Sequence, residues 1–171
     1  MLPEYRAALP EALAAIREAE LIALGPGSLY TSIIPNLLVG GVADAIIQSD
    51  SVKVYVGNVM TQEGETEGYT AADHIRAVFL HSRSNLFDLC LVNDSPIPEE
   101  IRERYAQEGA EPLRVDDSAC AALGVELVRR PVSRIEKGYV RHDPDLLARA
   151  LIEIHSQSRV RIAGGGYQKE F

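Results

Sequence analysis

Short apolar runs alternate along the chain with longer segments whose apolar residues recur at helical spacing. The runs 21–24, 52–56 and 87–92 are nearly continuously apolar, a pattern typical of strands buried on both faces of a parallel sheet. Each run is followed by a segment with helical periodicity. This order predicts an α/β fold, in which a Rossmann-like, doubly wound, mostly parallel sheet carries helices on both faces.

Start and stop signals place the remaining elements. Thr70 and Asp73 have the spacing of a capping box, and Pro98 and Asp143 suit the beginnings of two further helices. We expect helices over Pro3–Ala19, Leu29–Leu38 and Val42–Ser49, others beginning at Thr70, Pro98 and Asp143, and short strands at Pro112–Val115 and Val125–Val132. The sequence shows no internal repeat and no linker, so residues 1–160 are predicted to form a single domain and residues 161–171 a flexible tail.

Charge and cysteine content narrow the class of protein. The 17 Lys and Arg residues face 25 Asp and Glu residues, and the net charge of −8 argues against nucleic acid as a partner. Cys90 and Cys120 lie in no metal-binding or disulfide pattern, which predicts a reducing cytoplasm as the compartment. The uncharged stretch 21–43 contains two prolines and four glycines, so we expect no membrane span.

Candidate binding residues follow three predicted strands. Gly25, Gly27 and Ser28 come directly after the first strand, Asn58 after the second and Asn93 after the third. Carboxyl ends of parallel strands meet at one edge of a sheet, where ligands bind. The glycine-rich turn can present backbone N–H groups to a phosphate, or it is a tight turn with Ser28 as N-cap. Each asparagine can contact a ligand or stabilise its own turn.

Other side chains have two interpretations each. Tyr105 can stack on a base or sugar, or pack in the core. Arg141 belongs to a late basic cluster that can neutralise a diphosphate or protect an edge strand; the cluster comprises Arg129, Arg130, Arg134, Lys137 and Arg141. The acidic loop with Glu63, Glu65 and Glu67 could hold Mg²⁺, although a solvated loop is the simpler interpretation. No catalytic motif and no metal-ligand motif is evident.

Two long motifs carry a resemblance to a known family. The segments 25–36 and 58–74 resemble the gluconeogenesis factor family, a CofD-like group that also contains 2-phospho-L-lactate transferase. The resemblance extends from Ala23 to Leu151. It implies a cytoplasmic bacterial protein that binds UDP-N-acetylglucosamine and influences carbon metabolism, cell-wall growth and cell shape. It also implies that Tyr105 and Arg141 contact the sugar nucleotide.

One departure from this family concerns length. Family members are nearly twice as long and begin with a Gly-Gly-Gly-Thr-Gly segment after a first strand, whereas the glycine triplet here is Gly164–Gly166. The chain is therefore expected to be the C-terminal half of a family member, incomplete at its N-terminal side. An uncovered sheet edge would then favour a homo-oligomer.

Three functions remain open at this point. The first is a regulatory protein that binds a sugar nucleotide and offers a changed surface to a protein partner. The second is a phospholactate-type transferase that uses a nucleotide diphosphate donor, although no residues establish the general base or metal such an enzyme needs. The third is an assembly fragment without a ligand site. The segment 61–73 favours the first, because it resembles the regulatory branch of the family.

Overall fold

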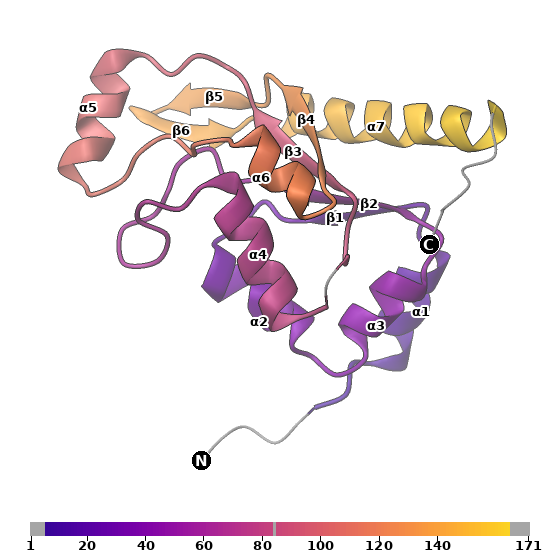
Figure 1. Ribbon diagram of the computed structural model, residues 1–171. Helices are drawn as coiled ribbons and strands as arrows, with labels where there is room; N and C mark the ends of the chain where they lie inside the picture. Colours follow the sequence, from indigo (N-terminus) through magenta and orange to yellow (C-terminus); the bar gives the residue numbers. More distant parts are fainter. Residues whose placement is uncertain (1–5, 84, 165–171) are drawn as a thin grey trace.

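A four-stranded parallel sheet forms the centre of the computed structural model, which describes residues 6–83 and 85–164 (Figure 1). The strands lie side by side in chain order: β1 (Leu21–Leu24), β2 (Val52–Val56), β3 (Leu89–Asn93) and β4 (Glu126–Arg130). All neighbouring pairs are parallel. The predicted α/β class with a mostly parallel sheet is therefore confirmed.

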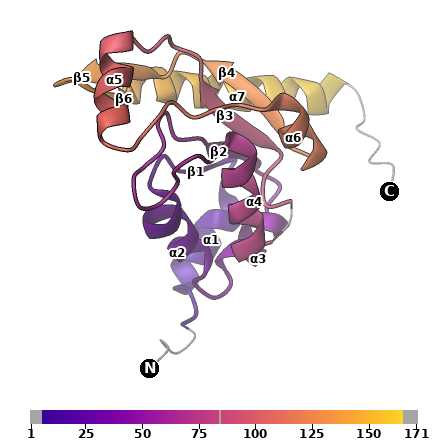
Figure 2. The same cartoon turned by 60° about the vertical axis from the view of Figure 1, so that its left-hand side comes forward.

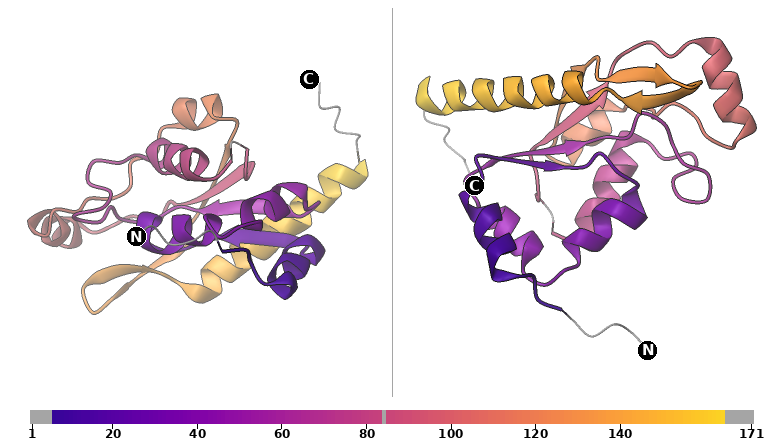
Figure 3. Two further views of the ribbon diagram at one scale, coloured as in Figure 1. Left: turned by 90° about the horizontal axis from the view of Figure 1, so that it is seen from below. Right: turned by 180° about the vertical axis from the view of Figure 1, so that it is seen from behind.

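Helices cover both faces of this sheet, as predicted (Figures 1 and 3). They are α1 (Pro10–Glu18), α2 (Ile34–Leu37) with the π-helical turn η1 (Leu29–Ile33) before it, α3 (Val42–Gln48), α4 (Ala71–His81), α6 (Asp117–Ala122) and α7 (Pro144–Gly164). Helix α5 (Glu99–Gln107) lies beyond the sheet. Strand β2 shows how the faces are divided. Tyr55 packs into the cluster that includes α2 and α4, whereas Val54 and Val56 pack into the cluster that includes Leu147 and Ile154 of α7. Successive strand residues point to opposite faces, so nearly every position of β2 is apolar.

An antiparallel hairpin extends the fold beyond the sheet. Its strands β5 (Ser133–Glu136) and β6 (Tyr139–His142) are joined by Lys137 and Gly138, whose φ angles of 52° and 78° are both positive. Two positive φ angles match the right-handed twist of a tight hairpin. The hairpin lies beside α5, where Val140 and Tyr105 share a small core (Figure 2). No pattern in the sequence predicted this hairpin.

The predicted elements over residues 3–19, 29–38 and 112–115 differ from the structure. The helix expected over 29–38 is divided into the π-helical turn η1 and the short helix α2. Helix α1 begins at Pro10 rather than at Pro3, because Leu9 is extended and a residue before proline avoids the helical region; residues 1–5 lie outside the described residues. The segment 112–115 makes two isolated bridges, from Pro112 to Met60 and from Arg114 to Thr70, instead of a strand. Its partners run in different directions, so no ladder forms.

The C-terminal helix reaches into the segment that was predicted as a tail. Helix α7 continues to Gly164, so residues 161–164 of the predicted flexible tail are helical, and residues 165–171 lie outside the described residues. Within residues 6–83 and 85–164, no helix is both long and apolar enough to cross a membrane.

Candidate functional site

A cleft of about 710 Å³ opens where the carboxyl ends of β1 and β2 face the hairpin and α5. Four segments contribute its walls: the turn after β1, the segment after β2, the end of α5 and strand β6. They supply Pro26, Gly27, Ser28, Asn58, Val59, Met60, Thr61, Gln62, Glu63, Tyr105, Glu108, Ala110, Tyr139, Val140, Arg141 and His142. Its size is that of a typical small-molecule site. The cleft lies at the sheet edge that the sequence analysis indicated.

The cleft has an inner and an outer end. The Gly57 carbonyl, directly after β2, lies close enough to the His142 imidazole to raise its pKa. This places His142 at the inner end of the cleft. Tyr139 donates a hydrogen bond of 3.2 Å to Glu108 of the α5 C-terminus, which places Tyr139 at the outer end. The three residue steps between them along β6 span roughly 10 Å. The backbone of Arg141 lies between these two residues, and its guanidinium lies 5.3 Å from the Tyr139 ring centre, toward the outer end.

The glycine-rich turn is held in a conformation that requires glycine at its first position. Gly25 has φ of +99°, and a Cβ there would lie 3.2 Å from the carbonyl oxygen of Val56. The peptide bond from Gly25 to Pro26 is cis. A Cβ on Gly27 would lie 3.0 Å from the Cβ of Ser32, so any side chain at Gly27 would crowd the following turn. Gly27 lines the cleft, whereas Gly25 supports the turn from outside the cleft lining.

The backbone donors after this turn already have a protein acceptor. The N–H groups of Tyr30 and Thr31 donate to Glu65 Oε1 at 2.8 and 3.2 Å. Ser28 occupies the N-cap position of η1, but its side chain makes no capping hydrogen bond. The Glu65 carboxylate therefore binds the first free donors of η1 and ties the acidic loop to the turn, and a phosphate at Gly27 and Ser28 stays a prediction.

The two asparagines differ in position. Asn58 lines the cleft. Asn93 lies outside the cleft lining, where its Oδ1 accepts a hydrogen bond from the Val132 N–H at 3.1 Å and its Nδ2 donates to the Ser95 carbonyl at 3.2 Å. Asn93 thus ties the end of β3 to the chain beyond β4. This agrees with the second interpretation of Asn93, in which it stabilises the backbone rather than contacts a ligand.

Tyr105 lines the cleft and also belongs to the core. Its side chain is buried with Val140, Ile101 and Met60. The Tyr105 hydroxyl donates to the Val140 carbonyl at 3.3 Å and accepts from the Val140 N–H at 3.1 Å. Both hydrogen bonds bind the hairpin to α5. Tyr105 can therefore offer the cleft its ring, while its hydroxyl is used within the protein.

Arg141 is the member of the basic cluster that lines the cleft. Its Nη1 donates to the Val140 carbonyl at 3.2 Å, its guanidinium lies 5.3 Å from the Tyr139 ring centre, and no carboxylate pairs with it among the described residues. The neighbouring arginines are paired elsewhere: Arg129 with Asp117, Arg130 with Glu153, and Arg134 with Glu136 and Asp143. The cluster therefore does not act as one diphosphate site, and Arg141 alone is positioned for an anion in the cleft.

His142 lines the cleft and was not among the predicted site residues. Burial lowers the pKa of its imidazole, and the nearby Gly57 carbonyl opposes that effect. His142 Nε2 is buried without a hydrogen-bond partner among the described residues. No local sequence signal marks this residue, because the hairpin that carries it was itself not predicted.

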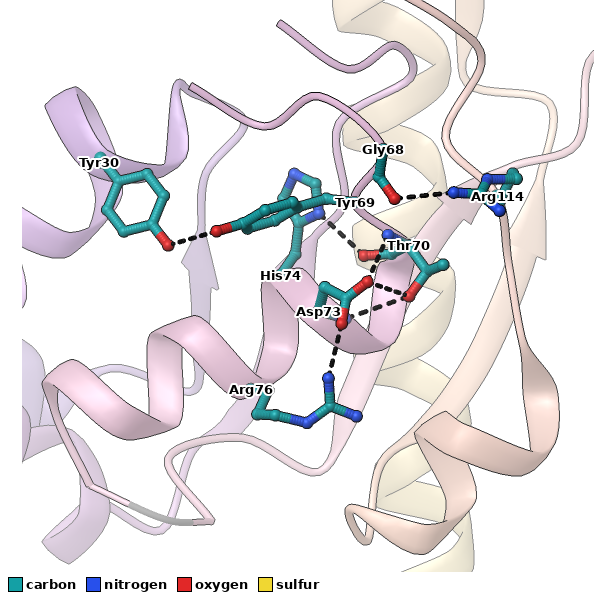
Figure 4. Close-up of polar contacts among 8 residues, drawn as sticks. All are labelled: Tyr30, Gly68, Tyr69, Thr70, Asp73, His74, Arg76 and Arg114. Atoms are coloured by element: carbon teal, nitrogen blue, oxygen red, sulfur yellow. Dashed lines mark hydrogen bonds and ion pairs between the residues drawn. The ribbon is translucent and has the colours of Figure 1, made fainter. Parts of the chain in front are cut away.

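The second long motif fastens the loop that forms one cleft wall. Figure 4 shows the capping box at the start of α4, in which Asp73 Oδ2 accepts from the Thr70 N–H at 2.9 Å and Thr70 Oγ1 accepts from the Asp73 N–H at 3.2 Å. The hydroxyls of Tyr69 and Tyr30 lie 3.0 Å apart, and this contact raises the pKa of Tyr30 to about 12. Arg114 donates to the Gly68 carbonyl at 2.7 Å. Contacts at both sides therefore hold the loop in place.

The acidic loop does not gather its carboxylates around one point. Glu65 accepts from Tyr30 and Thr31, and Glu67 accepts from the Gly64 N–H. Glu63 lies against Gly109 and lines the cleft. In the described part of the chain, no three His, Cys, Asp or Glu side chains come together as a metal site. The loop therefore serves here to cap and position backbone groups.

The sequence and the fold both match known proteins. The sequence model of the family described as 2-phospho-L-lactate transferase CofD matches residues 1–133. The chain belongs to the CofD family. Among curated CofD-type relatives, the gluconeogenesis factors of Bacillus subtilis and Halalkalibacterium halodurans are each 44% identical to this chain. These matches cover 90% of this chain and 49% and 48% of the relatives.

A solved structure shares the CofD-type fold. The crystal structure of a Bacillus halodurans protein, described as a member of the UPF0052 family, is similar with a TM-score of 0.85 and 44% identity. The similarity covers 88% of this chain and 49% of that protein. The chain thus spans about half the length of the relatives and the structure it matches. The expected resemblance to the gluconeogenesis factors and the Rossmann-like α/β fold are confirmed.

Proposed function

We propose that this chain is a regulatory protein of the gluconeogenesis factor type that binds a sugar nucleotide, such as UDP-N-acetylglucosamine, in the cleft. The observation that carries the proposal is the convergence of both long motifs on one cleft: Gly27 and Ser28 come from the first, Asn58 and Glu63 from the second. Arg141 adds a cation without a carboxylate partner among the described residues. The relatives are named gluconeogenesis factors, which supports a role in carbon metabolism. The further roles that we propose, in cell-wall growth and cell shape, would be exerted in the cytoplasm through a protein partner.

The alternative, a phospholactate-type transferase, has less support. The name of the matching family model is that of such an enzyme, but the curated relatives at 44% identity are named gluconeogenesis factors. A transferase needs a general base or a metal beside the reacting groups. The titratable side chains of the cleft are Glu63, Tyr105, Glu108, Tyr139 and His142. Of these, Tyr105, Glu108 and Tyr139 are already engaged in hydrogen bonds within the protein.

Calorimetric titration with UDP-N-acetylglucosamine tests the proposal. We expect the wild-type chain to bind, and Arg141→Ala to weaken binding by about ten-fold or more, because a hydrogen bond to a charged group contributes about 1.5–3 kcal/mol. Arg83→Ala is a matched control, since Arg83 pairs with Asp44 away from the cleft lining. Absence of binding to the wild-type chain, or equal affinities for the Arg141→Ala and wild-type chains, would contradict the proposed site. A parallel titration of the longer Bacillus subtilis relative would show whether its additional length is required.

A further inference from the structure

Arg104, near the end of α5, makes three contacts at the outer end of the cleft. Its Nε lies 3.8 Å from Glu108 Oε1, and its guanidinium carbon lies 4.1 Å from the centre of the Tyr139 ring. A Cβ built on Gly138 would overlap Arg104 Nη1, so the guanidinium fills the space beside this glycine. Arg104 is not itself among the residues that line the cleft. Its contacts therefore act on the groups that do.

Glu108 is the carboxylate that Arg104 pairs with, and it lines the cleft. Its Oε1 accepts a hydrogen bond of 3.2 Å from the Tyr139 hydroxyl, and the same oxygen faces Arg104. The carboxylate is thus placed beside the Tyr139 ring with a cation next to it. Without Arg104, Glu108 would keep its hydrogen bond to Tyr139 and lose its cationic partner.

Arg141 lies near the same ring and lines the cleft. Tyr139 and Arg141 are two positions apart on β6, so their side chains leave the strand on the same side. The Arg141 guanidinium lies 5.3 Å from the Tyr139 ring centre, and no carboxylate pairs with it among the described residues. Glu108 is bonded to the hydroxyl of this ring, within reach of a long and exposed arginine side chain. Both guanidinium groups therefore lie near one carboxylate, and only that of Arg104 pairs with it.

We propose that Arg104 is a positioning residue for the cleft. By pairing with Glu108 it keeps this carboxylate from pairing with Arg141, and it so leaves the Arg141 guanidinium available to an anionic group of the ligand. This inference rests on the proposed function, in which Arg141 contributes a cation to ligand binding. Exposed ion pairs are weak, so we expect the competition for Arg141 to change ligand affinity by a factor of about three to five.

Titration with UDP-N-acetylglucosamine tests this role. Arg104→Ala frees Glu108 to pair with Arg141, so the variant is expected to bind about three to five times more weakly than the wild-type chain. Arg104→Lys keeps a cation beside Glu108 and should bind within about two-fold of the wild type. Arg102→Ala is the matched control, because Arg102 lies on the same helix, 3.8 Å from Glu99 and outside the cleft lining, and it should bind like the wild type.

Two double variants separate positioning from a general effect of charge. In the Glu108→Gln background the competing carboxylate is absent, so the addition of Arg104→Ala should change the affinity by less than about two-fold. In the Arg141→Ala background the guanidinium to be positioned is absent, and Arg104→Ala should again have little effect. A general loss of positive charge, or a structural defect, would instead weaken binding in both backgrounds. The Arg104 side chain is exposed, so each variant is expected to fold, which urea denaturation checks.

The outcomes distinguish this role from the proposed function. Wild-type affinity for Arg104→Ala, or the same weakening in either double-variant background, would overturn the positioning role and leave ligand binding in the cleft intact. An Arg104→Lys chain that binds as weakly as Arg104→Ala would also overturn it, because the property that was lost would then not be the charge. Absence of binding to the wild-type chain would overturn the proposed function and this inference together.

Discussion

A single carboxylate joins the two long sequence motifs of this chain. Glu65 Oε1 accepts hydrogen bonds from the N–H groups of both Tyr30 and Thr31, so the acidic loop is attached to the turn that follows β1. Both segments line the cleft, the turn through Ser28 and the loop through Glu63. The donors belong to the first turn of η1, where N–H groups have no acceptor within the helix, and here the acceptor comes from a segment 35 residues away.

Substitution of Glu65 should therefore destabilise the chain in a graded way. Glu65→Ala leaves the part-buried Tyr30 N–H without its acceptor, whereas water can replace the acceptor of the exposed Thr31 N–H, and the change is expected to lower the free energy of unfolding by about 1 kcal/mol. Glu65→Gln keeps an oxygen at the Oε1 position and should cost less than half as much. Urea denaturation measures both values. Glu67→Ala is the control on the same loop, since its acceptor contact with Gly64 is exposed. Equal losses for Glu65→Ala and Glu67→Ala would show that the Glu65 contact is not stabilising.

Residue roles could be predicted from the sequence only in part. Tyr105 and Asn93 each had two interpretations, and the structure shows which residues they contact. Tyr105 is hydrogen-bonded to Val140, and Asn93 to Val132 and Ser95. These partners are up to 39 residues away along the chain. Spacing within one motif carries no information about such contacts. Whether Tyr105 and Arg141 contact a sugar nucleotide stays a prediction.

At the scale of elements, local signals were reliable where the whole signal lies within a few residues. The capping box at Thr70 and Asp73 predicted the start of α4, and both of its hydrogen bonds are present. The hairpin β5–β6 was missed because its strands carry Arg134, Glu136 and Arg141 at exposed positions instead of an alternating apolar pattern. Its turn signal, Lys137-Gly138, is weaker than Asn-Gly or Asp-Gly. The hairpin owes its position to packing against α5.

The capping box makes the stability of α4 depend on pH. Hydrogen bonds from the Thr70 backbone, its hydroxyl and Arg76 lower the pKa of Asp73, while partial burial acts in the opposite direction. A carboxyl whose native pKa lies below its unfolded value stabilises the fold above the unfolded pKa, and this contribution is lost as pH falls through the native pKa. The relevant window thus begins near the ordinary aspartate pKa of about 3.9 and extends below it.

Asp73→Asn tests this dependence. The Asn side chain has one acceptor oxygen, so it cannot accept from both Thr70 and Arg76 as Asp73 does. At neutral pH the variant is therefore expected to be less stable by about 1 kcal/mol, the usual magnitude of a helix cap. The difference between wild type and variant should diminish as the pH falls through the window below about 4. Urea denaturation across a pH series measures this difference in the free energy of unfolding. Asp50→Asn, at an exposed position after α3, should give a curve parallel to that of the wild type. A pH-independent difference for Asp73→Asn would contradict the role of its charge.

At the scale of the whole molecule, the sequence predicted which sheet edge carries the cleft. It did not predict that α5 and the hairpin form the facing wall. Parallel strands bring their carboxyl ends together, so the turn after β1 and the segment after β2 were expected to meet, and both line the cleft. The facing wall comes from α5 and the hairpin, which meet through the Tyr105 and Val140 contact. This contact depends on how separate elements pack, and no local pattern of the sequence specifies it.

The edge of the sheet bears on the state of association. Strand β1 pairs with β2 on one side, and within the described residues no strand covers its other side. Its sequence, Leu-Ile-Ala-Leu, has no charged residue, and Ala23 is exposed. Free edges without charge or proline are prone to pair with another chain. Because the chain spans about half the length of its relatives, we expect this edge to govern how the chain behaves in isolation.

The chain is therefore predicted to self-associate through β1. Sedimentation velocity is expected to show a dimer or larger species whose fraction grows with concentration. Ala23→Lys places a charge on the exposed side of the edge strand, where a second chain would have to bury it, so the variant should shift toward monomer. Ala121→Lys introduces the same charge at an exposed position of α6 and should sediment like the wild type. A wild-type chain that remains monomeric at high concentration would contradict association through this edge. An Ala23→Lys variant that associates as strongly as the wild type would instead place the contact elsewhere, because a buried lysine without a partner is costly enough to disrupt a strand-to-strand interface.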